Sequence, residues 1–135
     1  MSRELKGKVA IITGASRGIG KALASTCASL GINITIAARQ EGPLKETAEE
    51  IAKKYQVDVL PVACDVTKLE DLENLVNKTK EKFGRIDILV NNAGVSSQYP
   101  FPEQPIEDFE RLAHTNYLGY VRLIRLVIND MIKQK

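Results

Sequence analysis

Histidine, cysteine and tryptophan are almost absent from this sequence. Its 135 residues include one histidine (His114), two cysteines (Cys27 and Cys64) and no tryptophan. The cysteines lie far apart and form no CxxC pair, so a metal centre or a redox dithiol has almost no ligands from which it can be built. We therefore expect no metal site, and two partly buried free thiols in a reducing compartment.

Long apolar runs and an excess of charge of one sign are also missing. Nineteen Lys and Arg oppose seventeen Asp and Glu, which leaves a net charge of +2 and no electrostatic reason to expect nucleic acid or a membrane surface as partner. No apolar stretch approaches the roughly 20 residues that span a bilayer, and the N-terminus is polar. The sequence predicts a cytoplasmic protein with one domain over residues 1–135.

What is present is an alternation of short apolar runs with longer amphipathic ones, which indicates βαβ units and a parallel sheet. The expected strands are 9–12, 32–37, 57–63 and 86–90, and the expected helices are 18–30, 42–55, 67–83 and 106–133. Pro61 favours a sheet edge for the third strand. The pattern predicts an α/β fold: a Rossmann-type, doubly wound parallel sheet, truncated to about four strands in the order 3-2-1-4, with four helices.

Two local patterns refine the expected helices. The first helix has an apolar face at helical spacing that consists of Ile19, Leu23, Cys27 and Leu30. Thr67 and Glu70 have the spacing of a capping box, so we expect them to begin the third helix.

A glycine-rich turn, TGASRGIG at residues 13–20, follows the first strand and opens the first helix. Gly14 permits a sharp exit from the strand, Gly18 leaves room for a pyrophosphate beside the backbone, and Gly20 allows the helix to pack tightly. The free N–H groups and the dipole at the helix N-terminus attract phosphate groups. The turn predicts a dinucleotide site, with a purely structural turn as the alternative.

A P-loop is the rival nucleotide site, because Lys21 follows Gly20. That motif would need glycine at position 15 and serine or threonine at position 22, and both positions hold alanine. The sequence therefore argues against an ATPase.

With NNAG at residues 91–94, after the fourth strand, the glycine turn resembles the short-chain dehydrogenase/reductase family, namely its N-terminal cofactor-binding half. The resemblance runs from about Lys8 to the end of the chain. It assigns Asn92, Ala93 and Gly94 to the wall beside the nicotinamide ribose, although Asn92 could also form a polar turn that bonds its own backbone. The turn residues that it assigns to the cofactor are Gly14, Ser16, Arg17, Gly18, Ile19 and Gly20.

Two further segments agree with this family. Asp65 and Val66 resemble its Asp-Val step after the third strand, where the carboxylate holds the adenine amino group. Asn116 resembles the asparagine that kinks the fourth helix and holds a water in the proton relay. The resemblance thus implies that Asn116 is a catalytic residue.

The end of the second strand indicates which nicotinamide cofactor is bound. An acid about 20 residues beyond the glycines binds the ribose hydroxyls of NAD, whereas an arginine there accepts the 2′-phosphate of NADP. Arg39 lies 19 positions after Gly20, and no Asp or Glu occupies 36–40. Arg17 can reach the same phosphate, and two guanidinium groups around a dianion form charge-assisted bonds. Glu41 competes as a ribose ligand, but NADP is favoured over NAD.

The catalytic tyrosine of this family is followed by a lysine four residues later, which lowers its pKa, and is preceded by a serine. The tyrosines here are Tyr55, Tyr99, Tyr117 and Tyr120, and none has a lysine four positions later. We therefore expect an NADP(H)-binding portion of an oxidoreductase for a carbonyl or alcohol substrate, inactive alone. The alternatives are a non-catalytic NADP-binding module and half of a split enzyme completed by another chain.

Self-association is expected at the C-terminal side. Strand 86–90 would be a sheet edge, although its apolar run suits a central strand. From Tyr117 to Ile128, nine of twelve residues are apolar or tyrosine, more than one sheet face can cover. We expect a homo-oligomer through strand 86–90 and helix 106–133. The loop 95–105 is either a border of the substrate pocket or a rigid connector.

Overall fold

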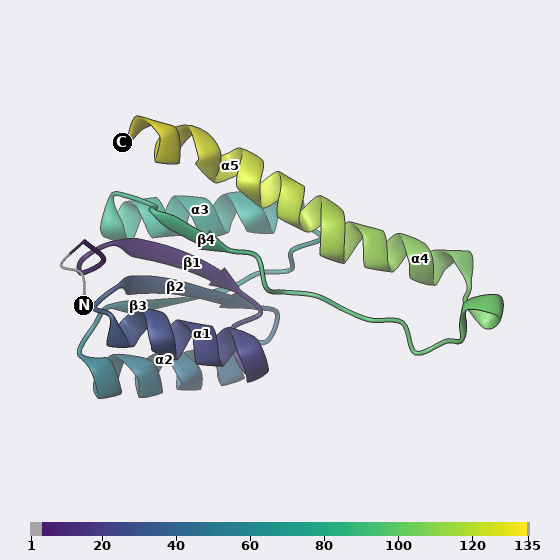
Figure 1. Cartoon of the computed structure of the whole chain (residues 1–135), viewed down its shortest axis with the longest axis horizontal. Coiled ribbons are helices and arrows are strands. Elements are labelled where there is room, and N and C mark those ends of the chain that lie inside the picture. The colour runs from purple at the N-terminus through teal and green to yellow at the C-terminus, as the bar shows by residue number, and fades with distance from the viewer. Residues whose placement is uncertain (1–3, 135) are drawn as a thin grey trace.

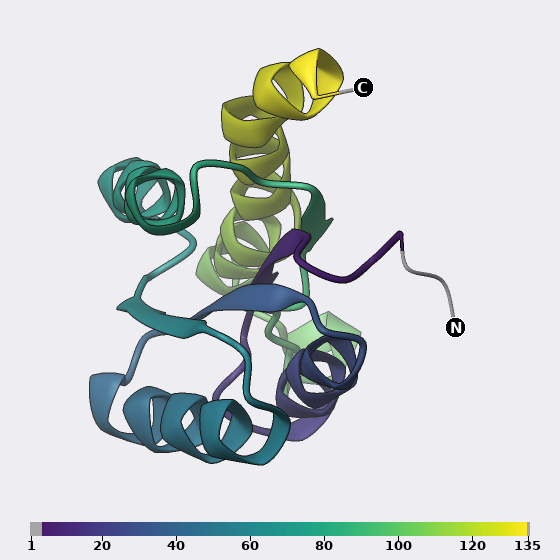
Figure 2. The same ribbon diagram turned by 90° about the vertical axis from the view of Figure 1, so that its left-hand side faces the viewer.

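The computed structural model describes residues 4–134 and contains a four-stranded parallel sheet with helices on both faces (Figures 1 and 2). The strands are β1 (Val9–Thr13), β2 (Asn33–Ala38), β3 (Val59–Ala63) and β4 (Ile88–Val90), in the order β3-β2-β1-β4. Helices α1 (Gly18–Ser29) and α2 (Glu41–Tyr55) cover one face, and α3 (Leu69–Phe83) and the last helix cover the other. The predicted α/β fold and strand order are confirmed.

The central strand β1 separates two hydrophobic cores. All five of its residues are buried, as a continuous apolar run in a parallel sheet requires. Ala10 and Ile12 belong to the core under α1 and α2, whereas Ile11 belongs to the core under α3 and the last helix. β3 lies at one edge of the sheet, so Pro61, which has no N–H to donate, is tolerated there as predicted.

Helix α1 packs on the sheet through small residues, and the face predicted for it is wrong at two positions. Ile19 is 74% exposed and Leu23 is 38% exposed. The buried residues of α1 are Gly20, Ala24 and Ala28. A Cβ atom on Gly20 would lie 2.1 Å from the carbonyl oxygen of Gly14, so the first turn of this helix is too close to the glycine turn for any side chain at position 20.

The N-terminus of α3 also differs from its prediction. The Thr67 hydroxyl donates to Asp65 Oδ1 at 2.7 Å, and no side chain caps the helix, which begins at Leu69. The predicted capping box is therefore wrong, because Lys68 and not Thr67 occupies the cap position, and the Thr67 oxygen accepts no N–H of the helix. The predicted stop is confirmed, since Gly84 has the left-handed conformation at φ 72°.

The last helix is continuous in space but changes its winding once (Figure 1). It consists of α4 (Ile106–Ala113), a π-helical turn (His114–Leu118) and α5 (Gly119–Lys133). The prediction of one helix over 106–133 has the correct ends but lacks this turn. Within residues 4–134, no helix is both long and apolar enough to cross a membrane.

Candidate functional site

The glycine turn and residues 91–94 meet where β1 and β4 end, at the point where the strand order reverses. Gly14 has φ 65°, and a Cβ atom there would lie 2.9 Å from the Cα of Ala93. The Asn92 side-chain amide donates to the carbonyl oxygens of Thr13 at 3.0 Å and Gly14 at 3.2 Å. Asn92 therefore fastens the glycine turn to the segment after β4.

Thr13 completes this connection, and the sequence analysis did not identify it. Its hydroxyl is buried and accepts hydrogen bonds from the N–H groups of Asn92 and Ala93, both at 3.0 Å. It lies 3.5 Å from the carbonyl oxygen of Val90, to which it donates. A polar residue that ends an otherwise apolar strand was the only signal in the sequence.

The N-terminus of α1 lies at this edge of the sheet with unused donors. Within residues 4–134, the N–H groups of Gly18, Ile19 and Gly20 have no protein acceptor, and the first bond of the helix runs from Lys21 N–H to Arg17 O at 3.3 Å. Gly18 has φ 57° and nothing within 4 Å of a Cβ position. The end of α1 thus presents free donors and an unobstructed backbone, as a phosphate group needs.

The two arginines predicted to bind a 2′-phosphate lie on the same edge of the sheet. Arg39 directly follows β2, Arg17 precedes α1, and both are exposed. In the part of the chain that the structure describes, neither guanidinium has an ion-pair partner. Lys21, by contrast, pairs with Glu50 at 2.6 Å and so cannot act as a P-loop lysine without giving up this partner.

Helix α2 holds the glycine turn, and its first residue is Glu41, the acid that competes as a ribose ligand. The Thr47 hydroxyl is buried and donates to the carbonyl oxygen of Ser16 at 3.0 Å. Glu41, the first residue of α2, accepts from Lys45 at 2.8 Å, which holds the pKa of Glu41 below its usual range. Because Glu41 has this partner and a helix N-terminus to stabilise, its position needs no ribose hydroxyl to explain it.

Asp65 lies after β3 with its carboxylate partly engaged. Oδ1 accepts from the N–H and the hydroxyl of Thr67, at 3.0 and 2.7 Å, and the Asp65 N–H donates to Asp71 Oδ2 at 2.8 Å. Burial alone would raise the pKa of Asp65, but the Thr67 bonds and the charges of Lys68 and Arg39 hold it below its usual range. The carboxylate is therefore ionised at neutral pH.

Asn116 lies within the π-helical turn and clamps the loop after β4. Its Oδ1 accepts from the Val95 N–H at 2.9 Å, and its Nδ2 donates to the Val95 carbonyl oxygen at 2.7 Å. A Cβ atom on Gly94 would lie 3.3 Å from Asn116 Oδ1, so glycine suits this contact. The side-chain amide thus sets the path of the backbone at residues 94–95.

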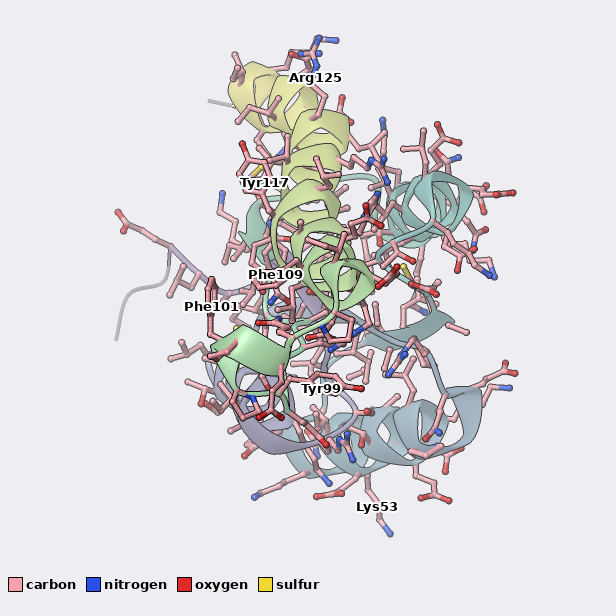
Figure 3. All side chains as sticks on the ribbon, turned by 90° about the vertical axis from the view of Figure 1, so that its right-hand side faces the viewer. Lys53, Tyr99, Phe101, Phe109, Tyr117 and Arg125 are labelled. Carbon is pink, nitrogen blue, oxygen red and sulfur yellow. The ribbon has the colours of Figure 1, made fainter. Side chains whose placement is uncertain are left out.

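The loop 95–105 projects beyond the sheet and carries apolar side chains. Tyr99 is 53% exposed and Phe101 is 78% exposed, and Figure 3 shows Phe101 beside Phe109 of α4. Their rings meet edge to face, with centroids 5.5 Å apart. Arg111 donates to the carbonyl oxygen of Ser96 at 3.1 Å and secures the loop to α4. The loop therefore carries exposed apolar side chains and is attached to α4 by these two contacts.

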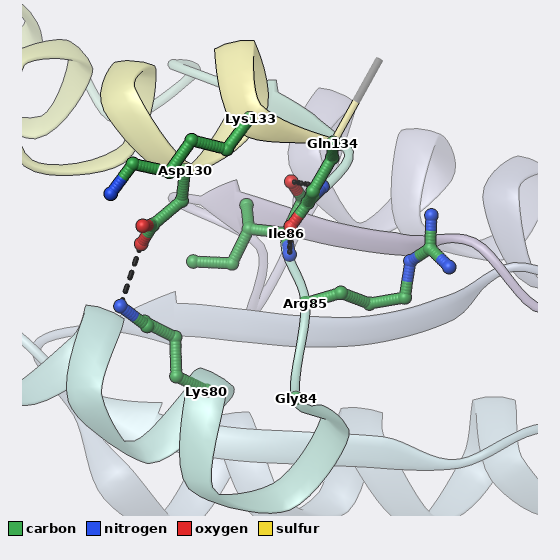
Figure 4. A pocket seen from close by; sticks show the side chains of 7 residues that line it. All are labelled: Lys80, Gly84, Arg85, Ile86, Asp130, Lys133 and Gln134. Carbon is green, nitrogen blue, oxygen red and sulfur yellow. Dashed lines mark hydrogen bonds and ion pairs between the residues drawn. The ribbon is translucent and has the colours of Figure 1, made fainter.

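The other reactive or hollow parts of the molecule have structural explanations. Burial raises the pKa of the Cys64 thiol to about 12, so this thiol is no nucleophile at neutral pH. A cavity of about 150 Å³ lies at the opposite end of the sheet (Figure 4), where Lys80 pairs with Asp130 at 2.6 Å. The Gln134 amide there bonds the backbone of Ile86. These polar groups satisfy one another.

Comparison with known proteins gives consistent matches along nearly the whole chain. The family model described as short chain dehydrogenase matches residues 8–135. An uncharacterized oxidoreductase of Staphylococcus saprophyticus is 41% identical over 131 residues, which cover 97% of this chain and 56% of that protein. The 11-beta-hydroxysteroid dehydrogenase A of Sesamum indicum is 42% identical over 125 residues, with 92% and 36% covered.

Solved structures agree in both fold and sequence. The L-sorbose reductase from Gluconobacter frateurii, complexed with NADPH and L-sorbose, has a TM-score of 0.92 and 39% identity over 96% of this chain and 49% of that one. An NAD⁺-bound xylitol dehydrogenase has a TM-score of 0.91 and 32% identity over 98% and 51%. The chain spans about half the length of the proteins that it matches.

Proposed function

The chain belongs to the short-chain dehydrogenase family, and we propose that its glycine turn binds NADP(H). The N–H groups of Gly18, Ile19 and Gly20 receive the pyrophosphate, and Arg17 and Arg39 hold the 2′-phosphate. The single observation that carries the preference for NADP is the pair of exposed guanidinium groups that have no partner among the described residues.

The other assigned residues line the rest of the dinucleotide. Asp65 and Val66 lie at the adenine, with Asp65 accepting its amino group. Asn92, Ala93 and Gly94 lie along the nicotinamide ribose, while the Asn92 side chain keeps the turn in place. The presence of NADPH in the L-sorbose reductase complex supports this assignment, although xylitol dehydrogenase holds NAD⁺.

We propose that residues 1–135 are one incomplete cofactor-binding domain of an oxidoreductase that acts in the cytoplasm on a carbonyl or alcohol substrate. When bound, the nicotinamide supplies or accepts the hydride. The residues of this chain orient the cofactor, and Asn116 holds the loop at Val95 beside it. The family resemblance further implies that Asn116 holds a water of the proton relay. No tyrosine here is followed by a lysine four residues later, so we expect no useful turnover from these residues alone.

We also propose that the protein self-associates through β4 and the last helix. In the described chain β4 pairs only with β1, which leaves its other edge open. One side of the last helix presents an exposed apolar stripe, which consists of Tyr117, Val121, Ile124, Ile128 and Ile132. An unpaired edge beside an apolar stripe favours a second copy as partner.

Calorimetric titration of the purified chain with NADP⁺ and with NAD⁺ tests the cofactor proposal. We expect NADP⁺ to bind at least about tenfold more tightly, because NAD⁺ offers the two arginines no phosphate dianion. Equal affinity would remove the role of the arginines, and the absence of binding to either dinucleotide would overturn the proposed function.

A further inference from the structure

The segment that carries Asp65 is held from three elements. Its backbone joins β2 through the bond from Cys64 N–H to Ala38 O at 3.0 Å. It joins α3 through the bond from Asp65 N–H to Asp71 Oδ2 at 2.8 Å. The third contact comes from α5, where Arg122 Nη1 donates to the Thr67 carbonyl oxygen at 3.3 Å. The position of Asp65 is thus fixed on both sides of the residue in the sequence.

Helix α5 approaches this segment closely because its first residue is a glycine. A Cβ atom on Gly119 would lie 2.9 Å from the carbonyl oxygen of Val66, a distance that real Cβ atoms essentially never show. Val66 is buried in the same core as Leu123 and Val127 of α5. The last helix therefore packs directly on the two residues that follow Asp65.

The Thr67 side chain decides which oxygen of Asp65 is available. Oδ1 receives two hydrogen bonds from Thr67, whereas Oδ2 has no partner among the described residues. Two donors on one oxygen fix the orientation of the carboxylate, because a partial rotation about the Cβ–Cγ bond of Asp65 would lengthen both hydrogen bonds. An ionised carboxylate accepts hydrogen bonds and donates none. The free oxygen is therefore complementary to a nucleobase that donates a hydrogen bond.

Resting on the proposed function, we propose that Thr67 is a positioning residue that directs Asp65 Oδ2 to the exocyclic amino group of adenine. In this role Arg122 and Gly119 fix Thr67 and its neighbour Val66 from the last helix. The site then selects a 6-aminopurine. A 6-oxopurine would direct a carbonyl oxygen at the carboxylate, which leaves two acceptors face to face.

The test compares NADP⁺ with nicotinamide hypoxanthine dinucleotide phosphate, which differs from it in the purine alone. We expect the wild-type chain to bind NADP⁺ at least about tenfold more tightly in calorimetry. Thr67→Val removes the hydroxyl but keeps the shape, and should reduce this preference at least about threefold. Thr67→Ser keeps the hydroxyl and should retain the preference, a rescue that a purely structural role does not require.

The outcomes separate this inference from the proposed function. A folded Thr67→Val that keeps the full preference overturns the role of Thr67. Equal binding of the two dinucleotides to the wild type overturns the inference while NADP binding stands, and binding of neither overturns the proposed function. If the circular dichroism spectrum shows that Thr67→Val does not fold like the wild type, Arg122→Met is the second variant. A reduced preference of Arg122→Met for NADP⁺ over the hypoxanthine dinucleotide supports the positioning of Thr67 by α5, and an unchanged preference contradicts it.

Discussion

Arg17 and Arg39 differ from nearby Lys21 in having no carboxylate partner in the described chain. Lys21 forms an ion pair with Glu50, whereas the two guanidinium groups are exposed at the edge of the sheet where β1 and β2 end. A long side chain that is fixed by no partner loses conformational entropy when it binds a ligand, so its contribution depends on the strength of the bond gained. A phosphate dianion supplies such a bond, and a ribose hydroxyl does not.

The first prediction concerns Arg39. Arg39→Ala should weaken NADP⁺ binding about tenfold to a hundredfold, because it removes a charge-assisted contact with the 2′-phosphate. NAD⁺ binding should stay within about twofold. Calorimetry on the wild type and the variant measures both values.

Lys53→Ala serves as the matched control, since it removes an exposed positive charge from α2 (Figure 3). We expect no change in the preference for NADP⁺. An equal loss in both variants would mean that Arg39 acts only through the net charge of the protein.

The second prediction concerns Asp87 at the opposite end of the sheet. Burial alone would raise its pKa, but hydrogen bonds from Arg85 and the Val9 N–H, with the charge of Lys8, hold the pKa below its usual range. A lowered carboxyl pKa in the folded state stabilises the protein above the unfolded pKa, and this stability is lost as the pH falls through the folded value.

Asp87→Asn should therefore lower the free energy of unfolding by about 2 kcal/mol at pH 7, and by progressively less as the pH falls below the unfolded pKa of about 3.9 and through the lower folded value. Urea denaturation at several pH values measures this difference. The same loss at all of these pH values would show that the charge of Asp87 is not what stabilises the fold.

At the scale of elements, the N-terminus of α1 contributes to the candidate site because this helix lies so close to the glycine turn that follows β1. Its buried face consists of small residues, and its first glycine has an open left-handed conformation. Large side chains such as Ile19 stay outside this contact. The close approach places the N-terminus of the helix where β1 and β4 end, so its dipole and its free N–H groups would act on the same phosphate group.

The third prediction tests this close approach. Gly20→Ala brings a Cβ atom within 2.1 Å of the Gly14 carbonyl oxygen, so the turn must shift. We expect the free energy of unfolding to fall by about 1–3 kcal/mol and NADP⁺ binding to weaken. Gly42→Ala in α2 is the control, since nothing lies within 4 Å of its Cβ position, and it should not lose stability.

The sequence predicts the sheet better than it predicts helix contacts. Strand order follows from apolar runs and from general connection rules, and the expected end of the third helix at residue 83 is correct because Gly84, which follows it, adopts the left-handed conformation that favours glycine. The face of α1 was wrong because periodicity counts apolar residues and ignores their volume. The cap at Thr67 was wrong because the spacing of Thr67 and Glu70 does not fix where the helix begins, and the structure begins it at Leu69 with Lys68 at the cap position.

The candidate site shows the same division. Its glycines and arginines were predicted from their order along the chain, because each follows a particular strand, whereas Asp65 was predicted from the family resemblance. Thr13 and Thr47 were missed, since their hydroxyls hold the site through contacts with β4 and the glycine turn that no local pattern encodes. The family resemblance implied a kink at Asn116, but the periodicity of the sequence showed no π-helical turn there, because the bond from Asn116 to Val95 spans a whole loop.

At the scale of the whole molecule, the last helix connects three parts of the structure. It packs on residues 66–67 through Gly119 and Arg122, it clamps the loop after β4 through Asn116, and its outer side carries an exposed apolar stripe. Association of two copies along that stripe would therefore press on an element that also shapes the cofactor site. Oligomerisation and cofactor affinity should be coupled, as linked equilibria require.

The fourth prediction addresses this stripe. Ile124 and Ile128 are 45% and 36% exposed, and changing both to Glu should shift a self-associated protein towards the monomer. Sedimentation velocity at micromolar concentration measures the shift. Asn77→Glu, at an exposed position of α3, is the control and should leave association unchanged. A wild-type chain that sediments as a monomer would contradict the proposed interface.

The most direct test of the central claim is an NMR titration of the ¹⁵N-labelled chain with NADP⁺. The backbone N–H groups of Gly18, Ile19 and Gly20 and the side-chain N–H groups of Arg17 and Arg39 should show the largest chemical-shift changes. These changes should saturate together, and NAD⁺ should leave the arginine signals nearly unmoved. Shifts concentrated at the other end of the sheet, or none at the glycine turn, would contradict the account.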